Sequence, residues 1–132
     1  MKTIIQYGSH EIVLCSTHVG QAKPWDGKTI KEAFNINVIV NDRFITNFLF
    51  YQKDSWIRKK EDVVYAFYCF VSDASYAIMS IGEFASEFGY TDIELCIKTY
   101  QACQVSLEQY RSLKIQGDIY DLLNWLTETY NI

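Results

Sequence analysis

The chain has 132 residues and a formal net charge of −4, from 16 Asp and Glu against 12 Lys and Arg. This length fits one domain, which can bury about two-thirds of the surface of the unfolded chain without disulfides or metal ions. The mild acidity excludes a dedicated nucleic-acid-binding protein, because such proteins carry a basic stripe and a high pI. We therefore expect no direct sequence-specific DNA binding, although one basic cluster is present: Lys53, Arg58, Lys59 and Lys60.

The sequence carries no signal for export or membrane insertion. Lys2 is followed by only a short apolar pair before Gln6, unlike a signal peptide, and no apolar run approaches the ~20 residues that span a bilayer. We expect a cytoplasmic protein with no membrane partner and with reduced thiols. Four cysteines lie inside apolar patterns: Cys15, Cys69, Cys96 and Cys103.

The first 52 residues are predicted to be mostly strands. Residues 1–7 and 11–17 are rich in β-branched side chains, and the segment around Gly8 between them indicates a hairpin. Residues 19–29 contain two glycines and the single proline, which predicts a loop.

A second strand pair is predicted at residues 34–40 and 44–51, with the turn at residues 41–43. The first of these strands alternates between apolar and polar residues, as a strand with one buried face does. Residues 48–51 are apolar on both sides, which suggests a strand that is covered on both faces or lies beside a partner.

From Glu61 onward the apolar residues recur at helical spacing, and residues 73–75 are predicted to end this first helix. Ser80 and Glu83 have the spacing of a capping box that opens a short second helix, and Gly89 is suited to end it. This short helix is expected to bury two phenylalanines, Phe84 and Phe88.

A capping box that starts at Thr91 predicts a long third helix reaching about Lys114, and Gly117 and Asp118 break it and cap a last helix. Strands followed by helices favour one α+β domain over residues 1–132, with about four antiparallel strands packed against a helical half, residues 60–132, of about four helices. The predicted buried stripe of the third helix is Ile93, Cys96, Tyr100, Cys103, Leu107 and Tyr110, extended by Ile97 and Leu113.

Motifs for catalysis or cofactor binding are weak in this chain. Residues 20–29 superficially resemble a phosphate-binding loop, but six residues separate its glycines where four are needed, and one of the six is a proline. Cys15 and His18 have the spacing of half a zinc site, with no second pair nearby. Cysteine packing and helix capping explain the remaining Cys–His and carboxylate pairs, so we expect no enzymatic activity, no cofactor and no metal.

The aromatic content and an uneven charge instead indicate contacts with a partner. The chain has 10 Tyr, 8 Phe and 3 Trp, and Tyr and Trp are favoured anchors at interfaces. Residues 1–75 carry nine basic and eight acidic side chains, a net of +1, whereas residues 76–132 carry three and eight, a net of −5. The predicted contact residues are Trp25, Tyr51 and Trp56 as apolar anchors, and Glu83, Glu87, Asp92 and Glu94 as an acidic face.

Four features occur in order between Phe34 and Cys103: the second strand pair, a helix that begins Glu61-Asp62 and ends Asp73-Ala74, the segment Glu87-Phe88-Gly89-Tyr90, and Tyr100-Gln101-Ala102-Cys103. In these features the chain resembles a group of small, uncharacterised proteins carried by phages and other mobile elements of bacteria. It departs from the group at Ala85, where the group usually has Cys, and near Lys59, where the group has a proline.

The resemblance implies a mobile-element accessory protein in the cytoplasm of a bacterial host, and it implies no catalytic residue. Small proteins from this setting often inhibit host defence, and anti-CRISPR proteins are examples. We therefore expect a non-enzymatic protein that inhibits a host protein or RNA–protein defence complex, such as a CRISPR effector, by occupying a functional surface. A homodimer is also possible for this chain. Two alternative functions stay open. The first is a small nucleotide-binding or signal-sequestering or signal-modifying protein that uses His18 or Lys28, and the second is a structural or oligomerisation protein of a phage.

Overall fold

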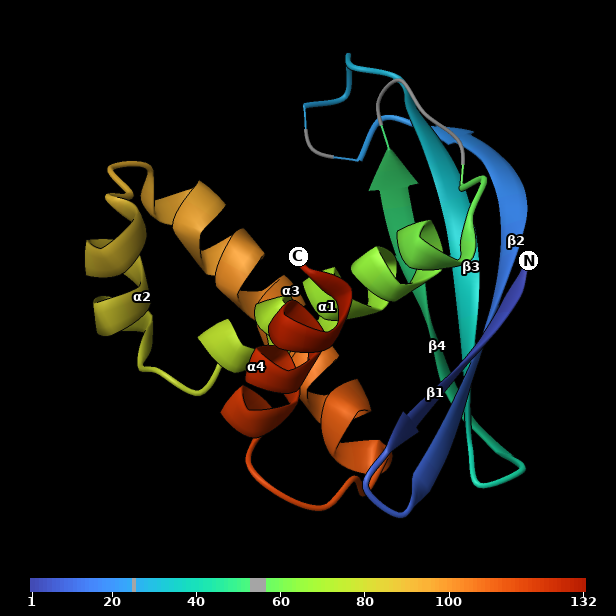
Figure 1. Ribbon diagram of the computed structural model, residues 1–132. Helices are drawn as coiled ribbons and strands as arrows, with labels where there is room; N and C mark the ends of the chain where they lie inside the picture. The colour runs from blue at the N-terminus through green and yellow to red at the C-terminus, as the bar shows by residue number, and fades with distance from the viewer. Residues whose placement is uncertain (25, 53–56) are drawn as a thin grey trace. The chain divides into compact units, whose positions relative to one another are not determined.

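The structure, a computed structural model, describes residues 1–24, 26–52 and 57–132. In these residues four strands, β1 to β4, are followed by four helices, α1 to α4 (Figure 1). The predicted α+β class, with an N-terminal antiparallel sheet and a helical second half, is confirmed.

The chain divides into two compact units, Met1–Phe67 and Tyr68–Ile132, and helix α1 (Lys60–Tyr76) contributes to both. The first unit holds the sheet and the beginning of α1, and the second holds the end of α1 and the three later helices. A single domain in which the sheet packs on the helical half stays a prediction.

The sheet of the first unit is a meander in which each strand pairs with the next one along the chain. Because every connection joins neighbouring antiparallel strands, the geometry of the turns helps to set the register of each pair. In the turn between the third and fourth strands, Asn41 and Asp42 have φ of 51° and 66°, the left-handed pair that a tight hairpin turn requires. The strands are β1 (Lys2–Tyr7), β2 (His10–Ala22), β3 (Lys31–Val40) and β4 (Arg43–Gln52).

Strand β2 is longer than the sequence predicted. Residues 19–22, which were expected to begin a loop, continue the strand to Ala22 and pair with β3. The register shifts between His18 and Gly20, which marks a bulge, and Gly20 has a φ of 126° that only glycine adopts easily. The glycine that indicated a loop is therefore a bulge inside a long strand.

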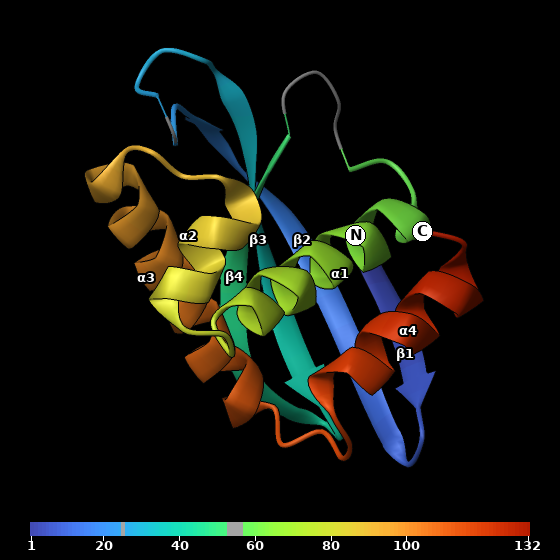
Figure 2. The same ribbon diagram turned by 90° about the vertical axis from the view of Figure 1, so that its left-hand side faces the viewer.

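One face of the sheet forms the core of the first unit, and the beginning of α1 lies along this face (Figure 2). The rings of Phe50 on β4 and Tyr65 on α1 meet edge to face, with centroids 6.2 Å apart. Burial of alternate strand residues is the physical reason for the apolar alternation seen in the sequence. Fully buried side chains include Ile12, Leu14, Ile36, Val38, Val63 and Phe67.

The opposite face of the sheet is partly exposed. Leu49 and Phe44 on β4 are exposed apolar side chains, so coverage of residues 48–51 on both faces is wrong at Leu49, and the alternative of a neighbouring partner stays a prediction. Beside them, the side-chain amide of Asn47 donates to Asn35 at 2.6 Å, and the amide of Asn35 donates to Asn37 at 2.9 Å. This face combines an amide network with exposed apolar residues.

Helices α2 (Ile81–Phe88), α3 (Ile93–Ser112) and α4 (Ile119–Tyr130) each begin at a side-chain cap. The predicted caps Ser80 and Asp118 are confirmed, and so is the left-handed Gly89, with a φ of 66°. The predicted cap Thr91 is wrong, because Asp92 occupies that position and accepts a hydrogen bond from the Leu95 N–H at 3.1 Å. A carboxylate satisfies the N–H groups and dipole of a helix start better than a threonine hydroxyl does.

The predicted buried stripe of α3 holds along most of the helix but not at its beginning. Ile93 is 74% exposed and Ile97 is also exposed, so the prediction is wrong for both. At 100° per residue, Ile97 lies about 100° and Ile93 about 60° around the helix from buried Cys96, which places both at the edge of the stripe. The buried members of the stripe are Cys96, Cys103, Leu107, Tyr110 and Leu113.

In the described residues, no helix combines the length and apolarity that crossing a membrane requires.

An aromatic cluster joins α2 to the beginning of α3. Phe84 is buried at its centre, with ring centroids 4.9 Å from Phe88 and 5.3 Å from Tyr100. The Tyr100 hydroxyl donates a hydrogen bond of 2.6 Å to the carbonyl oxygen of Met79, in the turn between α1 and α2. This bond ties the turn to α3. The cluster consists of Tyr76, Phe84, Phe88, Tyr90 and Tyr100.

The left-handed Gly89 provides a test of the α2 boundary. A Cβ at this position would meet no other atom within 4 Å, so replacement by Ala costs only backbone strain, which is about 1 kcal/mol of unfolding free energy. Urea unfolding of the G89A variant measures this loss. The matched control is G82A, inside α2 at an ordinary φ, where an added Cβ makes only an ordinary van der Waals contact with the Ser80 Oγ at 4.0 Å, and it should be neutral or stabilising by up to about 1 kcal/mol. Equal effects of the two variants would contradict the role of the left-handed conformation.

Removal of the Tyr100 hydroxyl tests the tie between α3 and the turn. The Y100F variant keeps the ring contacts and loses the bond to Met79, so the unfolding free energy should fall by about 1 kcal/mol. The control is Y120F on α4, where the exposed tyrosine makes no hydrogen bond through its hydroxyl in the described residues and the change should stay within about 0.5 kcal/mol. An unchanged stability of Y100F in urea unfolding would show that the bond does not support the fold.

Candidate functional site

The four predicted acidic residues come together at one end of the second unit. Glu83 and Glu87 lie four residues apart on α2, and Asp92 and Glu94 lie at the beginning of α3. The two helices are in contact and joined by a short loop (Figure 1), so the four residues belong to neighbouring segments. We call residues 81–97 the α2–α3 corner.

Two of these carboxylates make hydrogen bonds within the fold and two do not. Asp92 caps α3, and Glu83 accepts a hydrogen bond from the Ser80 hydroxyl at 3.1 Å. Glu87 and Glu94 are exposed and make no hydrogen bond or ion pair with the described part of the chain. Their charges are therefore available to a partner.

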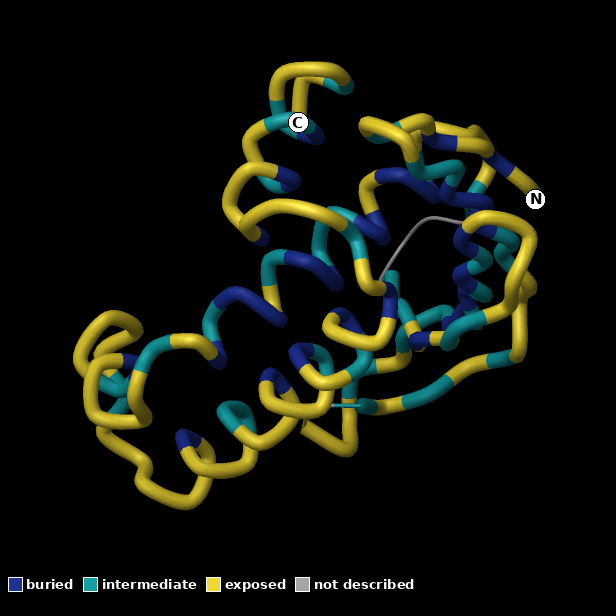
Figure 3. The backbone as a smooth tube through the Cα atoms, turned by 90° about the horizontal axis from the view of Figure 1, so that it is seen from below, coloured by how far each residue is buried: buried dark blue, intermediate teal, exposed yellow. Residues whose placement is uncertain are grey.

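Apolar side chains are exposed between these acids, which the sequence did not predict. Ile93 is the most exposed of them, and Phe88 is 45% exposed although it was expected to be buried. Figure 3 shows that much of the chain in this region is exposed. Single exposed apolar residues are ordinary, but a group bordered by charges is typical of an interaction site. The group consists of Ile81, Phe88, Ile93, Leu95 and Ile97.

Contacts within the aromatic cluster fix the position of Phe88, one of the exposed apolar residues of the α2–α3 corner. Phe88 packs edge to face on Tyr76, with centroids 4.9 Å apart, and tilts against Phe84 at the same distance. One side of the Phe88 ring is thus fixed and the other is open to solvent. A ring held in this way can enter an interface with little loss of conformational entropy.

The three predicted aromatic anchors are not part of this corner. Tyr51 belongs to the first unit, where it lies half-buried near the end of β4 and opposite Ala33 of β3. Trp25 and Trp56 lie outside the described residues. The acidic residues lie on two contacting helices, and both halves of the predicted contact surface stay predictions.

A polar cluster on the sheet contains His18, which the nucleotide-binding alternative would use. The His18 ring nitrogen lies 2.6 Å from a Glu32 carboxylate oxygen, and the Gln21 amide donates to the other oxygen at 2.9 Å. Hydrogen bonds from Gln21 and then from His18 lower the pKa of Glu32. His18 is thereby held against β3.

In the loop that superficially resembles a phosphate-binding motif, backbone and side-chain donors bind an aspartate of the same loop. Asp26 accepts hydrogen bonds from the Thr29 hydroxyl and from the backbone N–H groups of Thr29 and Lys28. These bonds lower the pKa of Asp26 to about 2. The two N–H groups are directed at a carboxylate of the protein, as in an ordinary polar turn.

Asp73 and Cys103 both have raised pKa values, with desolvation as the main cause in each case. Burial raises the pKa of the Cys103 thiol to about 11, with a smaller contribution from the Asp73 charge. Desolvation by the surrounding protein raises the pKa of Asp73 to about 6, although the residue as a whole is exposed. Cys103 is therefore held as a thiol rather than as a nucleophilic thiolate.

The described residues contain no group of three His, Cys, Asp or Glu side chains placed to hold a metal ion. Comparisons of the chain with protein-family models, with curated proteins and with solved structures found no match. The candidate site is accordingly defined by geometry and charge alone.

Asp73 has a consequence for stability that can be measured. The folded protein holds its proton up to about pH 6, whereas the unfolded chain releases it near the ordinary pKa of 3.8. The contribution of Asp73 to the unfolding free energy should therefore fall as the pH rises from about 4 to about 6. The D73N variant removes this loss, and it should be more stable than the wild-type protein at pH 7 and similar to it below pH 4.

Urea unfolding across this pH range compares the two proteins. The control is D42N in the β3–β4 turn, where Asn tolerates the left-handed conformation and Asp73 is retained. Parallel pH profiles for D73N and the wild-type protein would contradict a raised pKa at Asp73.

Proposed function

We propose that the protein is a non-enzymatic binding protein of a phage or other mobile element, which inhibits a bacterial defence complex by occupying a functional surface. A CRISPR effector is the partner class that this setting favours. The observation that carries the proposal is the α2–α3 corner, where two contacting helices expose both carboxylates and apolar side chains. The resemblance to mobile-element proteins supports the biological setting and contributes no site residue.

The chemistry of the corner favours a basic partner surface. The eight acidic and three basic side chains of residues 76–132 create a negative field, which accelerates the approach of a positively charged partner. Defence complexes that bind nucleic acid carry such positive surfaces for phosphate groups. Carboxylates of the corner can take the place of phosphate groups on such a positive surface and thereby block the binding of nucleic acid there.

Affinity would come from the apolar side chains rather than from the charges. Rim charges mainly steer association, whereas apolar residues at the centre of an interface lose water and contribute most of the binding energy. Ile93 and Phe88 are exposed between the acids and are suited to this central position. Capping and ring packing hold the backbone around both residues, so little ordering is needed on binding.

The test is capture of purified, RNA-loaded CRISPR effector complexes by the protein, together with an interference assay in cells. The I93S variant should bind about tenfold more weakly, because truncation of a central interface residue typically costs more than about 1 kcal/mol. The E87Q/E94Q double variant should associate more slowly and show a weaker dependence on salt.

Two control variants match these changes in residue type. L49S removes an exposed apolar residue from the sheet, and E128Q removes an exposed carboxylate from α4. Both should bind like the wild-type protein. Failure to capture any complex, together with unchanged interference, would refute the proposed function, and equal losses in I93S and L49S would refute the role of the corner.

A further inference from the structure

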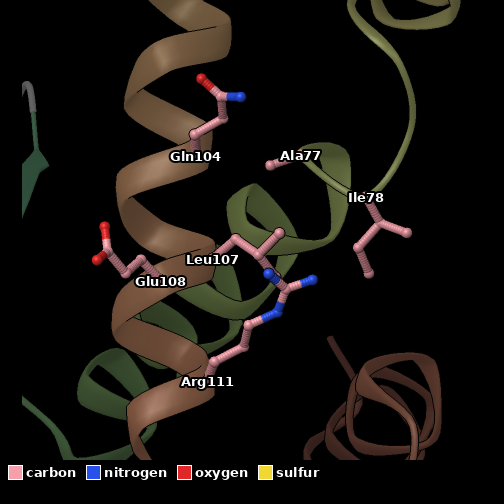
Figure 4. Close-up of a pocket in the computed structure, with 6 residues that line it drawn as sticks. All are labelled: Ala77, Ile78, Gln104, Leu107, Glu108 and Arg111. Atoms are coloured by element: carbon pink, nitrogen blue, oxygen red, sulfur yellow. The ribbon is translucent and has the colours of Figure 1, made fainter.

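A pocket of about 500 Å³ lies within the second unit, between α3 and the turn that follows α1. This volume is in the range of small-molecule sites in proteins. Ala77 and Ile78 form one wall and α3 forms the other (Figure 4). The residues that α3 contributes are Gln104, Leu107, Glu108 and Arg111.

The pocket contains one cation, Arg111, that has no side-chain partner within the described residues. Figure 4 shows Leu107 and Arg111 pointing from α3 toward Ala77 and Ile78, whereas Glu108 points to the other side of the helix. In the described residues the Arg111 guanidinium makes no ion pair and no side-chain hydrogen bond. Its fork of donors is suited to a carboxylate, which it can bind through two parallel hydrogen bonds.

The other lining residues are three apolar residues, the Gln104 amide and Glu108, whose carboxylate is directed to the other side of α3 from Arg111 (Figure 4). Leu107 is buried and Ile78 is exposed, so together with Ala77 they offer an apolar surface that a ligand can cover. The Gln104 side chain, one turn before Leu107 and Glu108 on α3, makes no hydrogen bond within the described residues and can both donate and accept.

The wall opposite α3 is held in position before any ligand binds. The Tyr100 hydroxyl donates to the carbonyl of Met79 at 2.6 Å and lies 3.4 Å from the carbonyl of Ala77. These contacts fix the turn relative to α3, and they make the pocket a feature of the folded unit rather than of a free loop. A preformed pocket reduces the entropic cost of binding.

We propose that this pocket binds a small carboxylate that carries an aliphatic group and an amide, with Arg111 holding the carboxylate. A single cation beside apolar walls suits one negative charge better than a phosphate group, which is bound by several positive or N–H donors. The net charge of −5 over residues 76–132 also disfavours multiply charged anions. The aliphatic group lies on Leu107, Ala77 and Ile78, and the amide meets Gln104.

N-acetylleucine is the probe, because it combines these three groups in twelve heavy atoms. Titration followed by two-dimensional NMR should shift the backbone signals of Ala77, Ile78 and Leu107, with a Kd of about 1 mM for a ligand of this size. N-acetylleucinamide, which has the same shape without the charge, should bind at least about tenfold more weakly.

The variant that tests the assignment is R111Q, which should weaken the binding of N-acetylleucine by about tenfold to a hundredfold and leave the amide unaffected. K114Q is the matched control, because Lys114 lies just beyond α3 and does not line the pocket. The ligand pair on the unmodified protein provides the same comparison if R111Q fails to fold. Equal binding of acid and amide, or no saturable shift at about ten times the expected Kd, overturns the proposal.

Discussion

The second unit depends on one hydrogen bond, from the Tyr100 hydroxyl to the carbonyl oxygen of Met79. The chain turns after α1 and must present a new helix start only a few residues later. The bond satisfies a carbonyl in this turn and ties it to the middle of α3. Because the ring of the same tyrosine packs on Phe84, one side chain fixes both the turn and the helix that follows it.

The two proposed binding regions share this turn. Ala77 and Ile78 line the pocket, and Ser80, a few residues later, caps the helix that begins the α2–α3 corner. Tyr100 contacts the carbonyls of Ala77 and Met79 between them. The contacts of the Tyr100 hydroxyl therefore fix both the wall of the pocket and the segment that leads into α2.

The α2–α3 corner shows how folding and binding divide a set of similar residues. Asp92 and Glu83 make hydrogen bonds at the helix starts, whereas Glu87 and Glu94 make no hydrogen bond or ion pair in the described residues. Phe84 is buried and Phe88 is its half-exposed neighbour. In this corner, some acidic and aromatic residues thus stabilise the fold, and others of the same type stay exposed to a partner.

The first unit offers a contrast, because its polar groups are largely occupied by one another. Asn35 and Asn47 bond across two strands, and the carboxylate of Glu32 is taken by Gln21 and His18. These bonds join neighbouring strands of a meander. They strengthen a sheet whose outer face still exposes apolar residues.

Most turns and caps of this protein were determined by the sequence alone, because they depend on residues close together in the chain. Asn41-Asp42, Ser80, Gly89 and Asp118 all act where the sequence placed them. Tertiary structure decided which apolar residues are buried, since Ile93 and Ile97 match a helical stripe but lie at its edge. It also decided that Arg111 faces a pocket, because Ala77 and Arg111 are brought together only by the fold.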